Sequence, residues 1–207
     1  ANIVPWQMLR DRIGVSLKIV PVEEDGSVDV ERFRAALGER TRLVALAHVS
    51  NTLGTVLPLE RMIPLAKEIG ATVLVDGAQA VPHMAVDVQA LGCDFYAFSG
   101  HKLFGPSGIG VLHGRLPLLD AMPPFLGGGG MIETVTFEKT TYAAVPEKFE
   151  AGTPDIAGAI ALGATIDWVE SVGIDRIAAW EHELLERATA ALEAIPGRDT
   201  AAMGTVA

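Results

Sequence analysis

The stretch TVLVDGAQA at residues 72–80 places four apolar or β-branched residues directly before an aspartate, a glycine and a glutamine. A short apolar run that ends at a turn signal is typical of a strand in a parallel sheet. Runs of the same kind stand at residues 43–47, 95–99 and 109–112. We therefore expect four strands, with the one at residues 43–47 covered on both faces, and polar residues directly after three of them.

Helical patterns separate these strands in the sequence. Pro5 suits the first turn of a helix, Asp29 can cap a second helix with its side chain, and Gly70 ends a third. We expect helices over residues 4–13, 29–37, 59–69, 155–172 and 174–194, and a further strand over the alternating residues 15–22. Strands that are separated by helices need crossover connections. The predicted fold class is therefore α/β, with a mostly parallel sheet flanked by helices.

The composition is that of a globular chain. Of 207 residues, 49% are hydrophobic and 20% are charged, which excludes a disordered chain. The formal net charge is −10 and no run is rich in lysine or arginine, so we expect no nucleic-acid partner. The single cysteine cannot form an internal disulfide, and we recognise neither a signal peptide nor an apolar stretch of membrane length. These features predict a soluble, cytoplasmic protein without a membrane partner.

Polar residues follow three of the expected strands, at residues 50–51, 76–79 and 99–102. In parallel sheets, ligands bind beyond the carboxyl ends of the strands. Asp76 and Lys102 form the central pair, because a carboxylate at the end of a buried strand needs a cationic partner. A lysine amine that loses its charge by desolvation can also attack a carbonyl and form a Schiff base.

Pyridoxal 5'-phosphate requires this set of groups: an amine for its aldehyde, a carboxylate for its pyridinium nitrogen, and donors for its phosphate. Gln79 and Asn51 are placed to donate to the phenolate oxygen, while Ser99 and His101 flank the lysine and can reach the phosphate. Two structural interpretations compete with this one. The aspartate and the lysine can form a strand-end ion pair, or the aspartate can cap the turn that follows it.

Three other features carry less chemistry. The glycines at residues 127–130 lack the lysine and Ser/Thr that follow the last glycine of a phosphate-binding P-loop. We interpret them as a loop near a site or a subunit contact. Cys93 stands before its strand, at the end away from the candidate site, and we expect it to be buried and structural. The histidines show no metal-ligand spacing, so we assign no metal site.

Five ordered segments resemble those of one family. They are HVSN (48–51), VDGAQA (75–80), FSGHKLFGPSGIG (98–110), GGGMI (128–132) and FEAGTP (149–154). The second and third are similar to the cofactor segments of class V, fold-type I pyridoxal-phosphate enzymes. Together the five resemble the SUF-type (group II) cysteine desulfurases, whose relatives include selenocysteine lyases. The likeness extends from Ala1 to about Ala194.

The resemblance implies a role for each candidate residue near the cofactor ring. Lys102 would bond covalently to the cofactor aldehyde and later move protons at the substrate Cα, with Asp76 at the ring nitrogen. Gln79 and Asn51 would lie near the phenolate oxygen, and Asn51 would also help to hold the substrate carboxylate.

It also implies a phosphate site, a homodimer and a reaction. Ser99 and His101 would bind the phosphate, and Thr153 would reach the phosphate of the neighbouring subunit. The family's reaction turns L-cysteine into L-alanine and leaves sulfur as a persulfide on an enzyme cysteine. A sulfur-acceptor or scaffold protein of the SUF system then takes that sulfur toward iron–sulfur clusters.

By the same resemblance, residues 1–172 form the central part of a large domain that binds pyridoxal phosphate, and residues 173–207 lead toward a C-terminal small domain. The family's nucleophilic cysteine and substrate-binding arginine fall beyond the sequence given. We therefore expect this chain alone to capture the cofactor at most in part and to turn over no cysteine. The alternatives are a selenocysteine lyase or another class V enzyme, and a non-catalytic unit that only binds the cofactor or dimerises.

Overall fold

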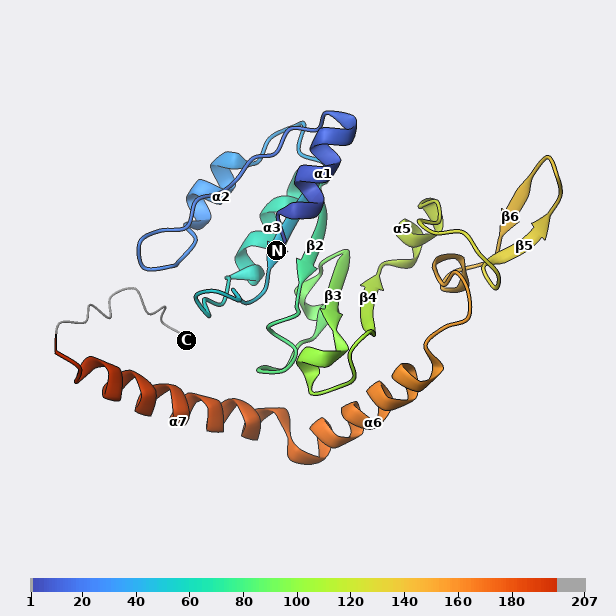
Figure 1. The fold of residues 1–207 in the computed structure, drawn as a ribbon. Helices are drawn as coiled ribbons and strands as arrows, with labels where there is room; N and C mark the ends of the chain where they lie inside the picture. Colours follow the sequence, from blue (N-terminus) through green and yellow to red (C-terminus); the bar gives the residue numbers. More distant parts are fainter. Residues whose placement is uncertain (1, 197–207) are drawn as a thin grey trace.

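The computed structural model describes residues 2–196 (Figure 1). Its helices are α1 (Val4–Ile13), α2 (Val30–Ala36), α3 (Leu59–Glu68), α4 (Val88–Leu91), α5 (Leu116–Ala121), α6 (Ile156–Val172) and α7 (Ile174–Glu193). Its strands are β1 (Leu43–Ala47), β2 (Thr72–Asp76), β3 (Phe95–Ser99), β4 (Gly110–Gly114), β5 (Ile132–Val135) and β6 (Thr140–Tyr142). Two short 3-10 helices are η1 (Gly100–Leu103) and η2 (Glu147–Phe149).

Parallel pairing joins the first three strands of the main sheet. The strand order is β1-β2-β3-β4, and β2 pairs in parallel with β1 on one side and with β3 on the other. Helix α3 connects β1 to β2, and α4 connects β2 to β3, which gives the crossovers that parallel strands need. Strand β4 is antiparallel to β3, because η1 and a short loop return the chain without a crossover. The predicted mostly parallel sheet with flanking helices is confirmed.

The main core lies between one face of this sheet and helices α2 and α3. Its buried side chains are Val30, Phe33, Val44, Leu46, Leu59, Met62, Ile63, Leu65, Ala66, Ala71, Val73, Val75, Cys93 and Tyr96. On the opposite face Ala45, Ala47 and Leu74 are only half-buried. The prediction that the strand at residues 43–47 is covered on both faces is therefore wrong. Small alanine side chains occupy two of its open positions, so a single helix layer is enough to bury the rest of the run.

Helices α6 and α7 run as an extended pair along the lower side of the molecule in Figure 1. On α6 only Gly158, Leu162 and Val169 are buried, and no residue of α7 is buried. Large apolar side chains remain exposed, among them Ile160 at 71% and Trp180 at 56%. No single described helix is long and apolar enough to cross a membrane. Taken together, the two helices have the length and composition of a membrane span, but the chain bends by 71° between them.

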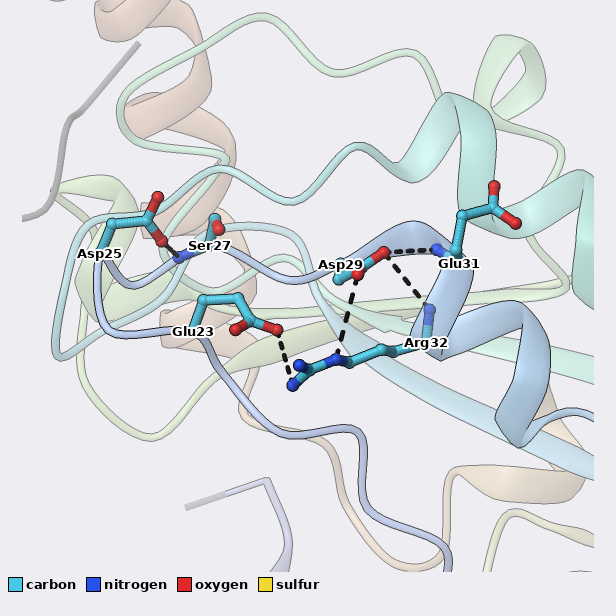
Figure 2. A network of polar contacts seen from close by, with 6 residues as sticks. All are labelled: Glu23, Asp25, Ser27, Asp29, Glu31 and Arg32. Carbon is cyan, nitrogen blue, oxygen red and sulfur yellow. Dashed lines mark hydrogen bonds and ion pairs between the residues drawn. The ribbon is translucent and has the colours of Figure 1, made fainter.

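Side chains fix the start of α2, as Figure 2 shows. Asp29 accepts hydrogen bonds from the backbone N–H groups of Glu31 (2.7 Å) and Arg32 (3.3 Å), which are donors that the first turn of a helix leaves unpaired. Arg32 also pairs with Glu23 at 2.9 Å and so ties the helix to the preceding turn. The predicted cap by Asp29 is confirmed.

The predicted helices agree with the observed ones to within one residue at each end. The predicted strand at residues 15–22 is wrong, because no described strand lies beside this segment to receive its hydrogen bonds. Lys18 in this segment instead donates to the carbonyl of Ala36, at the end of α2 (2.9 Å). The short helices α4 and α5, the hairpin β5–β6 and both 3-10 helices were not predicted.

A buried carboxylate holds the edge of the sheet at the amino ends of its parallel strands. The side chain of Asp94, just before β3, is 2% exposed and pairs with Nζ of Lys67 on α3 at 2.6 Å. The same carboxylate accepts a hydrogen bond from the N–H of Val73 on β2 (2.8 Å). Arg115, at the start of α5, lies 3.6 Å from it. Four elements therefore converge on one charge that is costly to bury without a partner.

We predict that Lys67→Met destabilises the chain by about 2–4 kcal/mol, because Asp94 stays buried after its nearest cation is removed while the aliphatic stem is kept. Arg115 offsets only part of the loss, since its side chain is 58% exposed. The measurement is the free energy of unfolding from urea titration. The control is Arg34→Met, whose exposed pair with Glu31 contributes less than about 1 kcal/mol. Equal losses in the two variants would contradict the role given to Asp94.

Candidate active site at the carboxyl ends of the strands

The carboxyl ends of β1, β2 and β3 meet at one edge of the sheet. Asp76, the last residue of β2, is in register with Ala47 of β1 and Ala97 of β3. Parallel pairing places the residues that follow these strands on the same side of the sheet. Six of the predicted site residues lie within four positions of a strand end here: Asn51, Asp76, Gln79, Ser99, His101 and Lys102.

Asp76 lies on the half-exposed face of β2. Burial alternates along this strand, so its side chain shares a face with Leu74, while Val75 is fully buried on the other face. One carboxylate oxygen accepts a hydrogen bond from the N–H of Ala78 (3.1 Å). Asp76 thus caps the turn after the strand, which was one of the two structural interpretations. The other is not seen: within residues 2–196 no ion pair joins Asp76 to Lys102.

Lys102 lies in η1, a single turn whose backbone is held in place by its neighbours. Gly100 donates its N–H to the carbonyl of Ile109 (2.8 Å). A Cβ on Gly100 would come within 2.9 Å of the Ile109 side chain, so this position favours glycine. Leu103 is buried, whereas His101 is exposed and Lys102 is half-buried. The turn therefore exposes His101 and leaves Lys102 half-exposed, next to the strand ends.

Helix α6 supports the far end of this turn. Phe104, directly after η1, has φ of 61°, a left-handed conformation that lets its N–H bond the carbonyl of Gly100. Its ring lies edge-to-face against Trp168 of α6, with 5.6 Å between the ring centroids. Ala161, Ala164 and Thr165 complete a shallow apolar hollow with these two rings. The contact joins the lysine-bearing turn to α6.

Asn51 and Gln79 lie in the turns that follow β1 and β2. Asn51 is exposed in a tight turn, in which the Ser50 hydroxyl accepts a hydrogen bond from the N–H of Leu53 (3.2 Å). Gln79 is half-buried, two residues after Gly77. Both side-chain amides are thus carried by turns at the same edge as Asp76.

Thr153 is the predicted site residue that the structure does not bring to this edge. It is exposed in the loop between η2 and α6. The neighbouring Gly152 donates its N–H to the carbonyl of Gly129 (2.8 Å), so this loop contacts the glycine-rich segment. In Figure 1 the loop, in orange, lies on the side of α5 and the hairpin β5–β6. The contact of Thr153 with the phosphate of a neighbouring subunit stays a prediction.

Two functional candidates, His48 and Tyr96, were missed by the sequence analysis. His48 follows β1 and is 6% exposed, and its Nδ1 lies 3.0 Å from the hydroxyl of Tyr96 on β3. Desolvation lowers the pKa of the imidazole and is opposed by the charge of Glu60. Desolvation likewise raises the pKa of the tyrosine hydroxyl, with a smaller contribution from the negative charge of Asp76. A histidine directly after β1 and a tyrosine in β3, on the two sides of β2, were the available signals.

Cys93 is unsuited to act as a nucleophile. It is 3% exposed, as predicted, and desolvation raises the pKa of its thiol above the ordinary value. The thiolate is the reactive form of cysteine, so a buried thiol with a raised pKa is inert. No group of three or more metal-ligand side chains gathers within residues 2–196.

We predict that the stability of the chain falls as the pH is lowered from 7 toward 5, in part through His48. The lowered pKa of the buried imidazole means that, below about pH 6.5, the unfolded chain binds the proton before the folded chain does. Stability therefore decreases until the pH is below the folded pKa and is constant thereafter. Urea titrations at a series of pH values measure this loss.

The His48→Gln variant should lose this part of the pH dependence, whereas His182→Gln, a change at an exposed histidine of α7, should keep it. An unchanged pH profile in His48→Gln would show that the imidazole does not titrate on unfolding.

The fold, a mostly parallel sheet flanked by helices, is that of the large domain of a fold-type I pyridoxal-phosphate enzyme. The chain belongs to the aminotransferase class-V family, whose sequence model matches residues 1–205.

Among curated proteins, the chain is 58% identical over 197 residues to a cysteine desulfurase of Dickeya dadantii, covering 95% of this chain and 48% of that protein. It is 54% identical to a cysteine desulfurase of Synechococcus elongatus, covering 95% of this chain and 32% of that protein. The chain thus spans about half, or less, of the length of these relatives.

Solved structures of cysteine desulfurases have the same fold. One is CsdA from Escherichia coli in its S-sulfonic acid form, with a TM-score of 0.92 at 43% identity, over 95% of this chain and 49% of that one. Another is the apo enzyme from Thermococcus onnurineus NA1, with a TM-score of 0.88 at 42% identity, over 92% of this chain and 48% of that one.

Proposed function

We propose that this chain is the part of a SUF-type cysteine desulfurase that binds pyridoxal 5'-phosphate. The observation that carries the proposal is the placement of Asp76 at the end of β2 and of Lys102 in the turn that follows β3, its parallel neighbour, in a class V fold. The donor set at this edge fits the cofactor, since it combines an amine, a carboxylate, two amides, a hydroxyl and an imidazole.

Asp76 is the proposed partner of the cofactor ring nitrogen. Its carboxylate stands half-buried at a strand end, where it attracts a cationic nitrogen more strongly than it would in bulk water. It thereby keeps that nitrogen protonated. When bound, the cofactor supplies an electron sink for the charge that develops at the substrate Cα.

Lys102 is the proposed covalent attachment point and the group that moves the proton at the substrate Cα. Gly100 and Leu103 are buried and hold η1 in place, while Lys102 itself is only half-buried. The turn can therefore keep the amine within reach of the same atoms when it is bonded to the cofactor and when it is released.

The remaining residues are proposed to orient the cofactor and the substrate. Asn51 and Gln79 donate to the phenolate oxygen, and Asn51 also holds the substrate carboxylate. Ser99 and His101 bind the phosphate. Thr153 reaches the phosphate in the partner subunit of a homodimer, which is compatible with its exposure and with its distance along the chain from the strand-end turns.

In the whole protein, L-cysteine and an enzyme thiol would give L-alanine and an enzyme persulfide, whose sulfur passes to an acceptor or scaffold protein of the SUF system for iron–sulfur cluster assembly in the cytoplasm. Cys93 does not supply that thiol, because it is buried with a raised pKa. Residues 1–172 would form the central part of the cofactor-binding large domain. Residues 173–207 would lead toward a small domain, and those after residue 196 lie outside the described part.

We predict that treatment with pyridoxal phosphate and then borohydride labels Lys102. Reduction fixes the cofactor on the amine to which it is bonded, so mass spectrometry of peptides identifies the site. Lys102→Ala should lose the label, whereas Lys139→Ala, a change in the exposed β5–β6 hairpin, should keep it. A label only at other lysines, or none on the folded chain, would contradict the proposed site.

We also predict that the chain alone forms no alanine from cysteine, because its only cysteine, Cys93, is buried. The whole protein that contains this chain should release L-alanine from L-cysteine. Alanine formation is measured with cysteine and selenocysteine, and kynurenine cleavage is measured in parallel. Sustained turnover by the chain alone would refute the first expectation, and preference for selenocysteine or kynurenine would refute the second.

A further inference from the structure

His48 and Tyr96 enclose the backbone of Asp76 from two sides. The N–H of His48 donates to the carbonyl of Asp76 (2.8 Å), which fixes the end of β2 against the residue after β1. On the other side, the Tyr96 ring packs flush against Gly77, leaving no room for a Cβ on that glycine. The N–H of Gly77 also donates to the carbonyl of Ala97 on β3 (2.8 Å). The strand end that carries the carboxylate is thus clamped by its two neighbours.

The two side chains of this clamp are joined to one another. Nδ1 of His48 lies 3.0 Å from the Tyr96 hydroxyl, and their rings meet at 90° with 6.0 Å between centroids. Burial favours the neutral form of each group, so one of the two donates the hydrogen bond and the other accepts it, according to the tautomer of the imidazole. A polar pair in an otherwise apolar core costs desolvation unless its hydrogen bond is made, so the bond fixes the relative position of the two rings.

The carboxylate of Asp76 has little support of its own. Its described hydrogen bond is local, from Ala78 two residues further on, and its side chain stands on the half-exposed face of the sheet. Its position relative to a ligand therefore follows from the backbone on either side of it. That backbone is what His48 and Tyr96 hold.

We propose that His48 and Tyr96 are positioning residues, whose buried hydrogen bond sets where the Asp76 carboxylate meets the cofactor ring nitrogen. The inference rests on the proposed function and adds to it a pair of residues that touch neither cofactor nor substrate. Breaking the hydrogen bond loosens the contact of the Tyr96 ring with Gly77. The Asp76 carboxylate then spends less time in the position in which it meets the ring nitrogen of the cofactor.

The first test is the affinity of the full chain for pyridoxal phosphate, measured by absorbance titration. Tyr96→Phe removes only the hydroxyl, and we expect the dissociation constant to rise about tenfold, the effect of one buried hydrogen bond. Phe33→Leu, in the same core but on α2, is the matched control for a general loss of stability and should bind as the wild type does. Equal affinities in wild type and Tyr96→Phe would overturn the inference.

The second test is rescue at the histidine. His48→Gln keeps an amide that can accept from or donate to the Tyr96 hydroxyl, whereas His48→Leu keeps no polar group. We expect His48→Gln to bind the cofactor more tightly than His48→Leu by about fivefold or more, at matched stability. Equal binding by the two variants would reduce the pair to a structural role and overturn the inference.

A third measurement needs no variant. In the ¹⁵N-labelled wild-type chain, the Nδ1 resonance of His48 should shift when the cofactor saturates the site. The reason is that His48 is hydrogen-bonded to the backbone of Asp76, and Tyr96 packs against the next residue, Gly77. An unmoved resonance would contradict the inference. Failure of the wild-type chain to be labelled at Lys102 would instead overturn the proposed function itself, so the two failures are distinguishable.

Discussion

The parallel register of β1, β2 and β3 is the constraint on which the candidate site depends. Because β2 is paired on both sides, its last residue, Asp76, is held level with Ala47 and Ala97. A slip of one residue would turn Asp76 toward the core and expose Val75. The loss of apolar burial makes that slip unfavourable. The same core that stabilises the sheet therefore decides which way the carboxylate faces.

The two ends of the parallel strands carry polar groups with opposite properties. At the amino ends, Asp94 is buried and saturated by a lysine, an arginine and a backbone N–H, so it can hold elements together but has no capacity left for a ligand. At the carboxyl ends, Asp76 and Lys102 are half-buried and make no ion pair with each other in the described part of the chain. A charged group whose hydrogen-bonding atoms are all paired within the protein stabilises the fold, whereas one that keeps unpaired hydrogen-bonding atoms can bind a ligand.

The sequence predicted the elements that depend on local signals. Capping by Asp29 and the apolar runs of the sheet located helices and strands to within one or two residues, because these signals act between neighbours in the chain. The prediction failed at residues 15–22, where the alternating pattern is present but no strand of the described residues pairs with it. It also failed to pair His48 with Tyr96, since residues 48 positions apart give no local signal of contact.

The sequence by itself determined the five longer helices, the four strands of the main sheet and the polar residues that follow three of them, because periodicity, caps and turn residues are written in short stretches. It also identified Asp76 and Lys102 as the central charges of the site. Only the tertiary structure decided that one face of the sheet is left open, that Thr153 lies away from the strand ends, and that a buried tyrosine packs under the aspartate turn. These depend on contacts between segments far apart in the chain, whose free energies are set by packing and burial.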